Sequence, residues 1–313
     1  MAYSQGGLIA ATDYNGFVGT ATTSGTINYV WSTGNGQFGY GQTAISQAAT
    51  SAGLITATQW ATMINTLNSI SKHQSGGSGT GITAPTAGSQ INYLSTLSSS
   101  ITTVNTNKLL FNGTQGTTTT GSVFSPNFTA VNQLAASTFT ITRTATFASA
   151  DAARYFFNAG GQLNFVIAST TNGDATSRSA DLVTLLSTNF ISKPAFRATS
   201  AGSRTGTGGT VNTDSTTIGY YNLTTSNQTL TQITSATSGY TSDNITLAVK
   251  SNGVQGSNAD VGTVITFTLT IVSAARTGTA FNDTINITPN HRIDVVYPET
   301  TNLTSSWGTV TIA

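Results

Sequence analysis

The chain has 313 residues, of which only 7% are charged, and its formal net charge is +1. Average soluble domains carry about 25% charged residues. A nearly neutral chain lacks the basic patches of nucleic-acid-binding proteins, so we expect no nucleic-acid partner. With 37% hydrophobic residues and little net charge, it does not have the composition of a disordered protein. No apolar run is long enough to span a bilayer, so we expect no membrane partner.

Thr, Ser, Asn and Gly together make up about half of the chain. Thr is β-branched and fits a pleated, half-buried surface, whereas Glu occurs once, at Glu299. The composition therefore predicts a mainly β protein with a few short helices. Cys is absent, which excludes disulfides and thiolate metal sites. A surface with so few charges repels copies of itself weakly, which favours a protein that works inside an assembly.

The first fifty residues are rich in glycine and aromatic residues and lack the features of a secretory signal. We predict a short strand at Thr26–Trp31. The following Gly34–Gln42 segment is expected to be an ordered loop that packs its own aromatic rings. A nucleotide-binding loop is disfavoured, because no strand–glycine–helix unit surrounds the segment.

Apolar residues at helical spacing predict a helix over 58–72, with Thr56 or Thr58 as its N-cap. A Gly/Ser/Pro linker follows, and a second helix is predicted over 90–105 with heptad-like spacing. Two interpretations of this second helix remain open: it packs on its own chain, or it meets copies of itself about a symmetry axis. The candidate assembly residues on the two helices are Trp60, Ile64, Leu67, Leu94, Leu97, Ile101 and Val104.

The remainder alternates between short strands, two helices and polar connections. Residues 112–125 are expected to form a polar hinge, and residues 199–217 an exposed loop or a long hairpin tip. Thr138–Phe147 alternates strictly, with Thr covering one face of the strand. One helix is predicted from Ser149 or Asp151, ended by Gly160 or Gly161, and another over 181–190, capped by Ser179 or Asp181. Further strands are predicted over 162–169, 217–223, 229–234, 244–250, 263–272, 283–288, 292–296 and 309–312.

These elements predict four units. They are a Gly-rich docking and assembly segment with a helix (1–75), a linker with the second helix (76–130), an α+β segment (131–200) and a β-sandwich-like domain (201–313).

Three stretches of the chain carry a resemblance. The first is Asp13-Tyr14-Asn15 with Gly34–Gln42, the second is Ile55–Trp60 leading to Lys72-His73-Gln74, and the third is Ala153–Phe165. In this order they resemble a group of virion structural proteins of tailed bacteriophages, of the tail, baseplate or fibre type. The resemblance is clearest over residues 8–75 and 150–168. It implies a component of the particle and no catalytic signature.

Titratable residues do not gather into a predicted active site, so we expect no catalytic, cofactor or metal site and no enzymatic activity. His73 is expected at a helix end and His291 at the surface of a turn, and neither has a nearby ligand partner in the sequence. Asp283 and Asp294 flank predicted strands and are interpreted as turn and cap residues rather than paired catalytic carboxylates. Asn172-Gly173-Asp174 is interpreted as a turn.

Aromatic residues amid Asn and Thr raise one binding hypothesis, a platform for a host surface glycan. Core or interface positions are the competing interpretation. The residues concerned are Tyr220, Tyr221, Tyr240 and Trp307.

The favoured hypothesis is a self-assembling, non-enzymatic structural subunit of a tailed-phage virion, associated with the tail as a fibre, neck or baseplate protein. Its expected partners are copies of itself, as a trimer, and other virion proteins, and its expected location is the virion, assembled in the host cytoplasm. One alternative is a capsid decoration or head-fibre protein. Another is a surface adhesin or carbohydrate-binding β module, which binding of a defined sugar without assembly partners would reveal.

Overall fold

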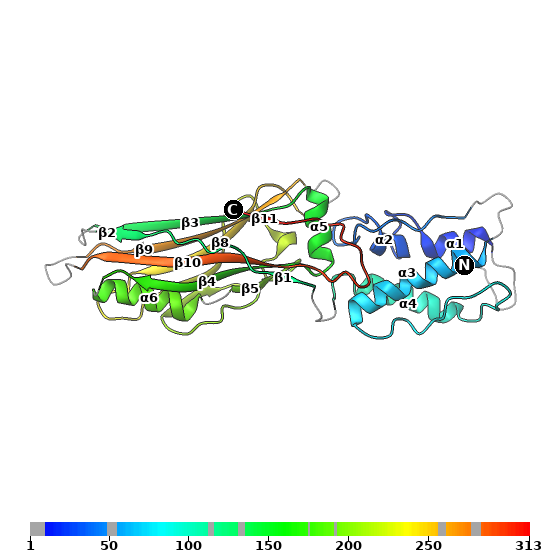
Figure 1. The fold of residues 1–313 in the computed structure, drawn as a ribbon, viewed down its shortest axis with the longest axis horizontal. Coiled ribbons are helices and arrows are strands. Elements are labelled where there is room, and N and C mark those ends of the chain that lie inside the picture. Colours follow the sequence, from blue (N-terminus) through cyan, green and yellow to red (C-terminus); the bar gives the residue numbers. More distant parts are fainter. Residues whose placement is uncertain are drawn as a thin grey trace.

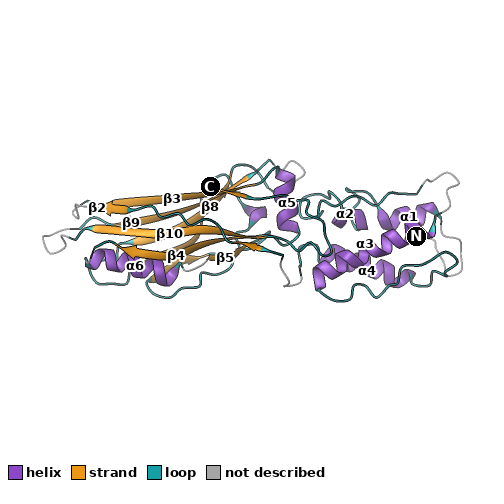
Figure 2. Ribbon diagram, in the orientation of Figure 1, coloured by secondary structure: helices purple, strands orange, loops and turns teal. Residues whose placement is uncertain are grey.

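A computed structural model describes residues 10–48, 55–111, 116–130, 135–174, 176–190, 193–255, 261–276 and 283–313. The molecule is elongated (Figure 1). Of the α-helices in the described residues, four lie at one end, and the other two lie with two layers of strands at the other end (Figure 2). The prediction of a mainly β protein with short helices is confirmed.

The helical end contains α1 (Ala11–Val18), α2 (Ile27–Trp31), α3 (Ala57–Ser75) and α4 (Leu94–Thr106). Thr56 caps α3, as predicted: its hydroxyl accepts from the Gln59 amide and the Gln59 side chain reaches back to Thr56. The strand predicted at Thr26–Trp31 is wrong, because this segment is α2. Ile27 and Val30 lie three residues apart and are both fully buried, so helical packing outweighs the β propensity of these residues.

The other end contains two antiparallel sheets, which pack face to face through rings such as Phe165 and Phe267, 6.1 Å apart between centroids. The smaller sheet has the order β1-β10-β4-β5, with β2 also on β10, and the larger sheet has the order β11-β3-β9-β8-β7-β6. The smaller sheet comprises β1 (Thr118–Thr119), β2 (Phe128–Ala130), β4 (Gln162–Asn172), β5 (Lys193–Phe196) and β10 (Ile285–Val296). The larger comprises β3 (Ser137–Thr146), β6 (Thr210–Asp214), β7 (Gln228–Thr234), β8 (Asn244–Ser251), β9 (Val264–Ser273) and β11 (Thr311–Ile312). Both sheets therefore draw strands from the expected units 131–200 and 201–313.

Helix α5 (Ala150–Asn158) follows β3, and α6 (Ser177–Asn189) lies against β4 and β10. Ser149 caps α5 as predicted, whereas the cap of α6 is Thr176 rather than Ser179 or Asp181. The strand predicted over 217–223 is wrong: Tyr220–Asn222 forms a 3-10 turn, and Tyr220 turns into the core.

The two strands predicted over 283–288 and 292–296 are one strand, β10. Pro289 and Asn290 suggested a turn, but β10 passes through them beside β4 with a register shift at Asn290/His291. The register skips Ala168 of β4 at this point, so Pro289 lies beside an irregular part of the ladder, where a residue without an N–H is tolerated.

The alternation of β3 is confirmed, and it continues across the larger sheet. Thr140, Thr270 and Thr246 stand opposite one another on neighbouring strands, and so do Ile141, Leu269 and Leu247. The aliphatic row is buried and the Thr row lies on the outer face. The outer face is thus covered mainly by hydroxyl and amide groups.

Residues 116–130, here called the strap, run along β10. The amide of Phe124 donates to the His291 carbonyl (2.9 Å) and the His291 amide donates back (3.0 Å). The Gly121 amide donates to the Asp294 carboxylate (3.0 Å). The described part of the predicted hinge over 112–125 is therefore hydrogen-bonded to a strand, while residues 112–115 lie outside the described residues. Among the helices that are described, none has the length and apolar character needed to cross a membrane.

Candidate functional site at the joint

The Gly34–Gln42 loop links the helical end to the sheets. It folds back on α2 through three backbone hydrogen bonds, including that from the Tyr40 amide to the Val30 carbonyl (2.9 Å). Gly39 and Gly41 have φ of +94° and +69°. A Cβ on Gly39 would lie 2.2 Å from the Thr33 carbonyl oxygen, and one on Gly41 would meet the Tyr155 ring at 2.4 Å. The glycines of this loop thus allow the close approach that brings the two ends together.

Helix α5 binds the backbone of this loop. The Asn158 side-chain nitrogen lies 3.0–3.1 Å from the carbonyl oxygens of Gly36, Phe38 and Gly39. The Arg154 guanidinium donates to the Phe38 carbonyl (2.7 Å). Asn158 is completely buried, and buried carbonyl groups need such donors. Asn158 is therefore the centre of this contact.

A third contact joins Gln42 to the C-terminal segment. Its amide nitrogen donates to the Thr304 carbonyl (2.8 Å), and its amide oxygen accepts from the Thr304 backbone nitrogen (2.9 Å). The side chain thus pairs with Thr304 as a neighbouring strand would, over a separation of 262 residues.

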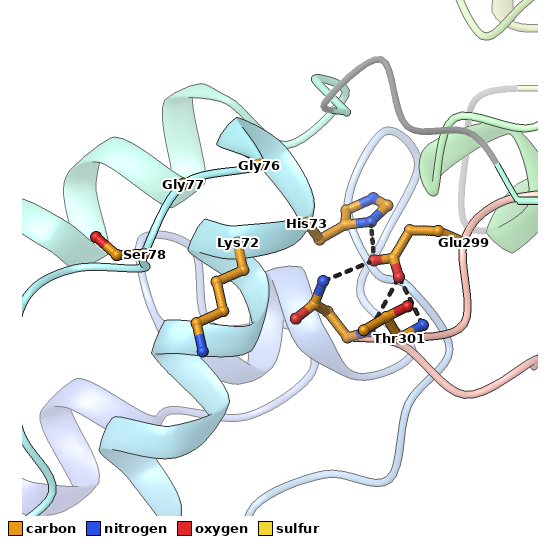
Figure 3. Close-up of a pocket in the computed structure, with 8 residues that line it drawn as sticks. Lys72, His73, Gly76, Gly77, Ser78, Glu299 and Thr301 are labelled. Carbon is orange, nitrogen blue, oxygen red and sulfur yellow. Dashed lines mark hydrogen bonds and ion pairs between the residues drawn. The ribbon is translucent and has the colours of Figure 1, made fainter.

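His73 and Glu299 form the fourth contact (Figure 3). Nδ1 of His73, near the end of α3, lies 2.9 Å from Oε1 of Glu299. Asn302 Nδ2 (3.2 Å) also donates to this oxygen, and the amides of Thr301 (2.6 Å) and Asn302 (3.0 Å) donate to Oε2. The only Glu of the chain therefore accepts four hydrogen bonds.

Electrostatics keep this carboxylate charged. Burial opposes ionisation, but the hydrogen bonds from His73 and Asn302 outweigh it and lower the pKa of Glu299 to about 2. The His73 side chain is fully buried, and the Tyr40 ring meets it edge-on at 5.1 Å. Burial also raises the pKa of Tyr40, although the hydrogen bond from Gln74 opposes this. We call these four contacts together the joint.

A pocket of about 560 Å³ lies beside the pair. Its lining comprises Lys72, His73, Gly76, Gly77, Ser78, Glu299, Thr301 and Asn302. Figure 3 shows Lys72 directed away from the carboxylate. A carboxylate with a pKa of about 2 and four donors is a poor acid and a poor base near neutral pH. His73 Nε2 is buried and has no hydrogen-bond partner among the residues that the structure describes. The arrangement is suited to holding the two ends together and not to moving protons.

Sequence reasoning missed this pairing because His73 and Glu299 are 226 residues apart. The sequence predicts His73 at a helix end, and it lies in the last turn of α3. Its side chain is buried, which the sequence did not indicate. The available signal was scarcity: a single Glu in a chain of 313 residues is a candidate for a specific partner.

The candidate assembly residues are buried in the folded protein, or partly so. Leu94 is partly buried and packed against the core, and the other six are at most 4% exposed. Helix α4 packs on α2 and α3, which is the first of its two interpretations. The heptad-like apolar side is therefore occupied by the same chain, and contacts between copies would need another surface. The six residues are Trp60, Ile64, Leu67, Leu97, Ile101 and Val104.

The proposed aromatic platform does not form. Tyr220, Tyr240 and Trp307 are buried, at 0%, 6% and 1% exposure. Tyr221 is partly buried, and its hydroxyl lies 2.7 Å from the Gly36 carbonyl oxygen and 2.6 Å from Asn158 Oδ1, within the joint. These rings pack in the core because burying a large aromatic surface away from water gives a large favourable free energy.

His291 is buried rather than at the surface. Arg143 Nε lies 2.8 Å from its Nε2, and its Nδ1 lies 2.9 Å from the Pro289 carbonyl oxygen. Arg143 can only donate and the Pro289 carbonyl can only accept, so the two contacts fit a neutral ring that accepts at Nε2 and donates through Nδ1.

Asp283 lies just before β10 and Asp294 lies near its end, so most of the strand separates them and they do not face one another. Asp283 accepts from the Tyr240 hydroxyl (2.5 Å) and Asp294 from Arg292 (2.8 Å). In the described part of the chain, no group of three or more His, Asp or Glu residues could hold a metal ion.

The comparisons with known proteins add no neighbour. No protein-family model matches the chain, and neither does any curated protein or solved structure.

Proposed function

We propose that the chain is a non-enzymatic, self-assembling structural subunit of a tailed-phage virion, associated with the tail as a fibre, neck or baseplate protein. The observation that carries the proposal is where the resembling stretches lie. Gly34–Gln42, Lys72–Gln74 and the α5 segment of Ala153–Phe165 meet at the joint. Part of each of the three resembling stretches thus lies in this one region.

The remaining stretches support the helical end. Tyr14 is buried beside Trp60, with ring centroids 6.0 Å apart. Asn15 exchanges two hydrogen bonds with the backbone of Ala48, at 2.9 and 2.7 Å. These residues hold loops in place, which accords with a structural role for the resembling positions.

The shape also supports the proposal. The molecule is long, with a helical end and a sheet end held together at the joint (Figure 1). Such a shape can bridge two attachment points that lie apart. In the proposed arrangement the helical end docks onto the particle and the sheets form a shaft or an exposed domain. The weakly charged Thr face would lie against neighbours without strong repulsion.

The test is to locate the protein in the particle. Purified virions of the encoding phage would be imaged by electron microscopy after labelling with an antibody against residues 244–273. We expect label on the tail. Label on the head would support the decoration or head-fibre alternative, and purified particles that lack the protein would overturn the proposal.

A further inference from the structure

Strand β3 forms one margin of the larger sheet, and only its last residues have a partner on the outer side. Thr311 and Ile312 of β11 stand opposite Thr146 and Ala145. Ala313 exchanges two backbone hydrogen bonds with Thr144, at 2.8 and 3.0 Å. From Arg143 back to Ser137, no strand of the described chain pairs with this side of β3.

The direction of the free backbone groups follows from the pairing. Hydrogen-bonding residues alternate along an antiparallel strand. Thr144 bonds outward to Ala313, while Phe147 bonds inward to the Thr263 carbonyl (2.9 Å). Thr138, Thr140 and Thr142 therefore direct their N–H and C=O groups away from the sheet, and their side chains are exposed.

The opposite margin of the sheet is irregular. Strand β6 has a register shift between Val211 and Thr213, and the preceding loop contacts its C-terminal end. The Ala201 amide donates to the Thr216 carbonyl (3.1 Å), and the Arg204 amide lies 3.3 Å from the Asp214 carboxylate. Bulges and covering loops are common means of preventing edge pairing. The described part of β3 has neither device.

We propose that the free edge of β3 pairs with β3 of a second copy, antiparallel about a twofold axis at Thr140. The sequence around this residue, Thr-Phe-Thr-Ile-Thr over 138–142, is nearly palindromic. The axis places Thr138 of one copy opposite Thr142 of the other and Thr140 opposite itself. Each free donor then meets a free acceptor, which gives about six backbone hydrogen bonds.

Two neighbours of the edge suit this pairing. Ala313 occupies the position beside Thr144, so it limits the partner strand to the stretch before it. Arg143, the only charged residue of β3, is engaged on the inner side: its guanidinium lies 3.6 Å from the Phe124 ring centroid and its Nε contacts His291. No charge on the outer face of β3 would oppose its copy.

This inference rests on the proposed function in one respect, since it supplies a surface for self-assembly. A contact through one short strand is smaller than the roughly 1,200–2,000 Å² of a stable interface. We therefore expect weak pairing in dilute solution that becomes strong when many subunits are held together in a particle.

Single cysteines test the pairing, because the chain has none of its own. Facing residues of a hydrogen-bonded antiparallel pair lie about 5.5 Å apart at Cα, within the range of a disulfide. Thr140→Cys is expected to form a covalent dimer on mild oxidation of the concentrated full-length chain. Thr246→Cys is the matched control, since it lies on the same face and in the same row but two strands from the edge. It is expected to stay monomeric.

Hydrogen exchange of the unmodified chain gives an independent readout. Raising the concentration should slow exchange of the amides of Thr138, Thr140 and Thr142 at least fivefold, and Thr140→Lys, which places two like charges face to face, should abolish this effect. Equal crosslinking of both cysteine variants, or exchange of these amides that does not depend on concentration, would overturn the inference. Self-association through another surface would overturn the inference and leave the proposed function standing. Crosslinking at Thr140→Cys in a protein that purified virions lack would overturn only the proposed function.

Discussion

The joint and the strap each bury one of the two histidines of the chain, in opposite electrostatic surroundings. At the joint, His73 faces the Glu299 carboxylate at 2.9 Å. Under the strap, His291 faces the Arg143 guanidinium, with 2.8 Å between Arg143 Nε and His291 Nε2. A positive charge on a histidine is attracted by the first neighbour and repelled by the second. The same residue type thus lies beside an acidic group in one region and beside a basic group in the other.

The order in which acid acts follows from the pKa values. Burial lowers the pKa of His291 and Arg143 lowers it further, although the hydrogen bond to Pro289 opposes them. The folded protein therefore loses stability as the pH falls below 6.5, the ordinary pKa of histidine, because the unfolded chain takes up the proton more readily. Glu299, with a pKa of about 2, stays charged to much lower pH. The strap should loosen before the joint does.

The largest effect is expected from removing the neutral centre of the joint. Asn158→Ala would leave buried carbonyl groups of the Gly34–Gln42 loop without donors, at a cost of about 3 kcal/mol. The measurement is urea denaturation followed by tryptophan fluorescence. Asn227→Ala, at an exposed position, should change stability by less than about 0.5 kcal/mol. Equal stability of the two variants would show that Asn158 does not hold the joint.

A smaller effect is expected from the charged contact of the joint. Glu299→Gln keeps the shape but loses the charge that accepts four hydrogen bonds, and should cost about 2 kcal/mol at pH 7. The folded pKa lies below the ordinary 4.5, so the contribution of Glu299 is complete above pH 4.5 and is lost as the pH falls toward 2.

Denaturation of the wild type and the Gln variant at pH 7, 4 and 2.5 checks this sign. The difference between them should shrink at the lowest pH. A difference that is constant over this range would mean that the ionisation of Glu299 contributes nothing to the joint.

Elements with strong local periodicity could be predicted from the sequence. The helix over 57–75 and the Thr-faced strand β3 carry their own signal, since apolar residues recur at the period of the element. Short segments failed where packing outweighed propensity: Ile27–Trp31 became a helix, and Tyr220 turned inward. Pro289 predicts a turn, but β10 continues through it beside an irregular part of β4.

The joint could not be predicted in the same way. The sequence predicts an ordered glycine-rich loop, but the partners of this loop, Asn158 and Thr304, lie more than a hundred residues away in the chain. The same is true of Glu299, the partner of His73. Polar contacts of this kind have no periodicity, and any Asn or Thr of this composition looks the same in the sequence. Only the rarity of Glu set one participant apart.

The smallest expected effect at neutral pH comes from the other histidine, and it separates the two regions most sharply. In His291→Gln, the amide oxygen can accept from Arg143 and the amide nitrogen can donate to Pro289, so stability at pH 7.5 should stay within about 1 kcal/mol of the wild type. The Gln side chain at position 291 cannot be protonated in this pH range. It should therefore lose less stability than the wild type between pH 7.5 and pH 5, where Glu299 is still charged in both proteins.

Hydrogen exchange of the strap, corrected for the intrinsic effect of pH, shows where the difference arises. In the wild type, acid should speed exchange at Phe124, whose amide bonds to the His291 carbonyl, while amides bonded to Glu299 remain protected. In the Gln variant both regions should remain protected at pH 5. If the wild type and the variant lost stability equally over this range, another group would have to be responsible. That result would contradict the claim that the strap depends on a neutral His291, while the claim that Glu299 stays charged in acid would be unaffected.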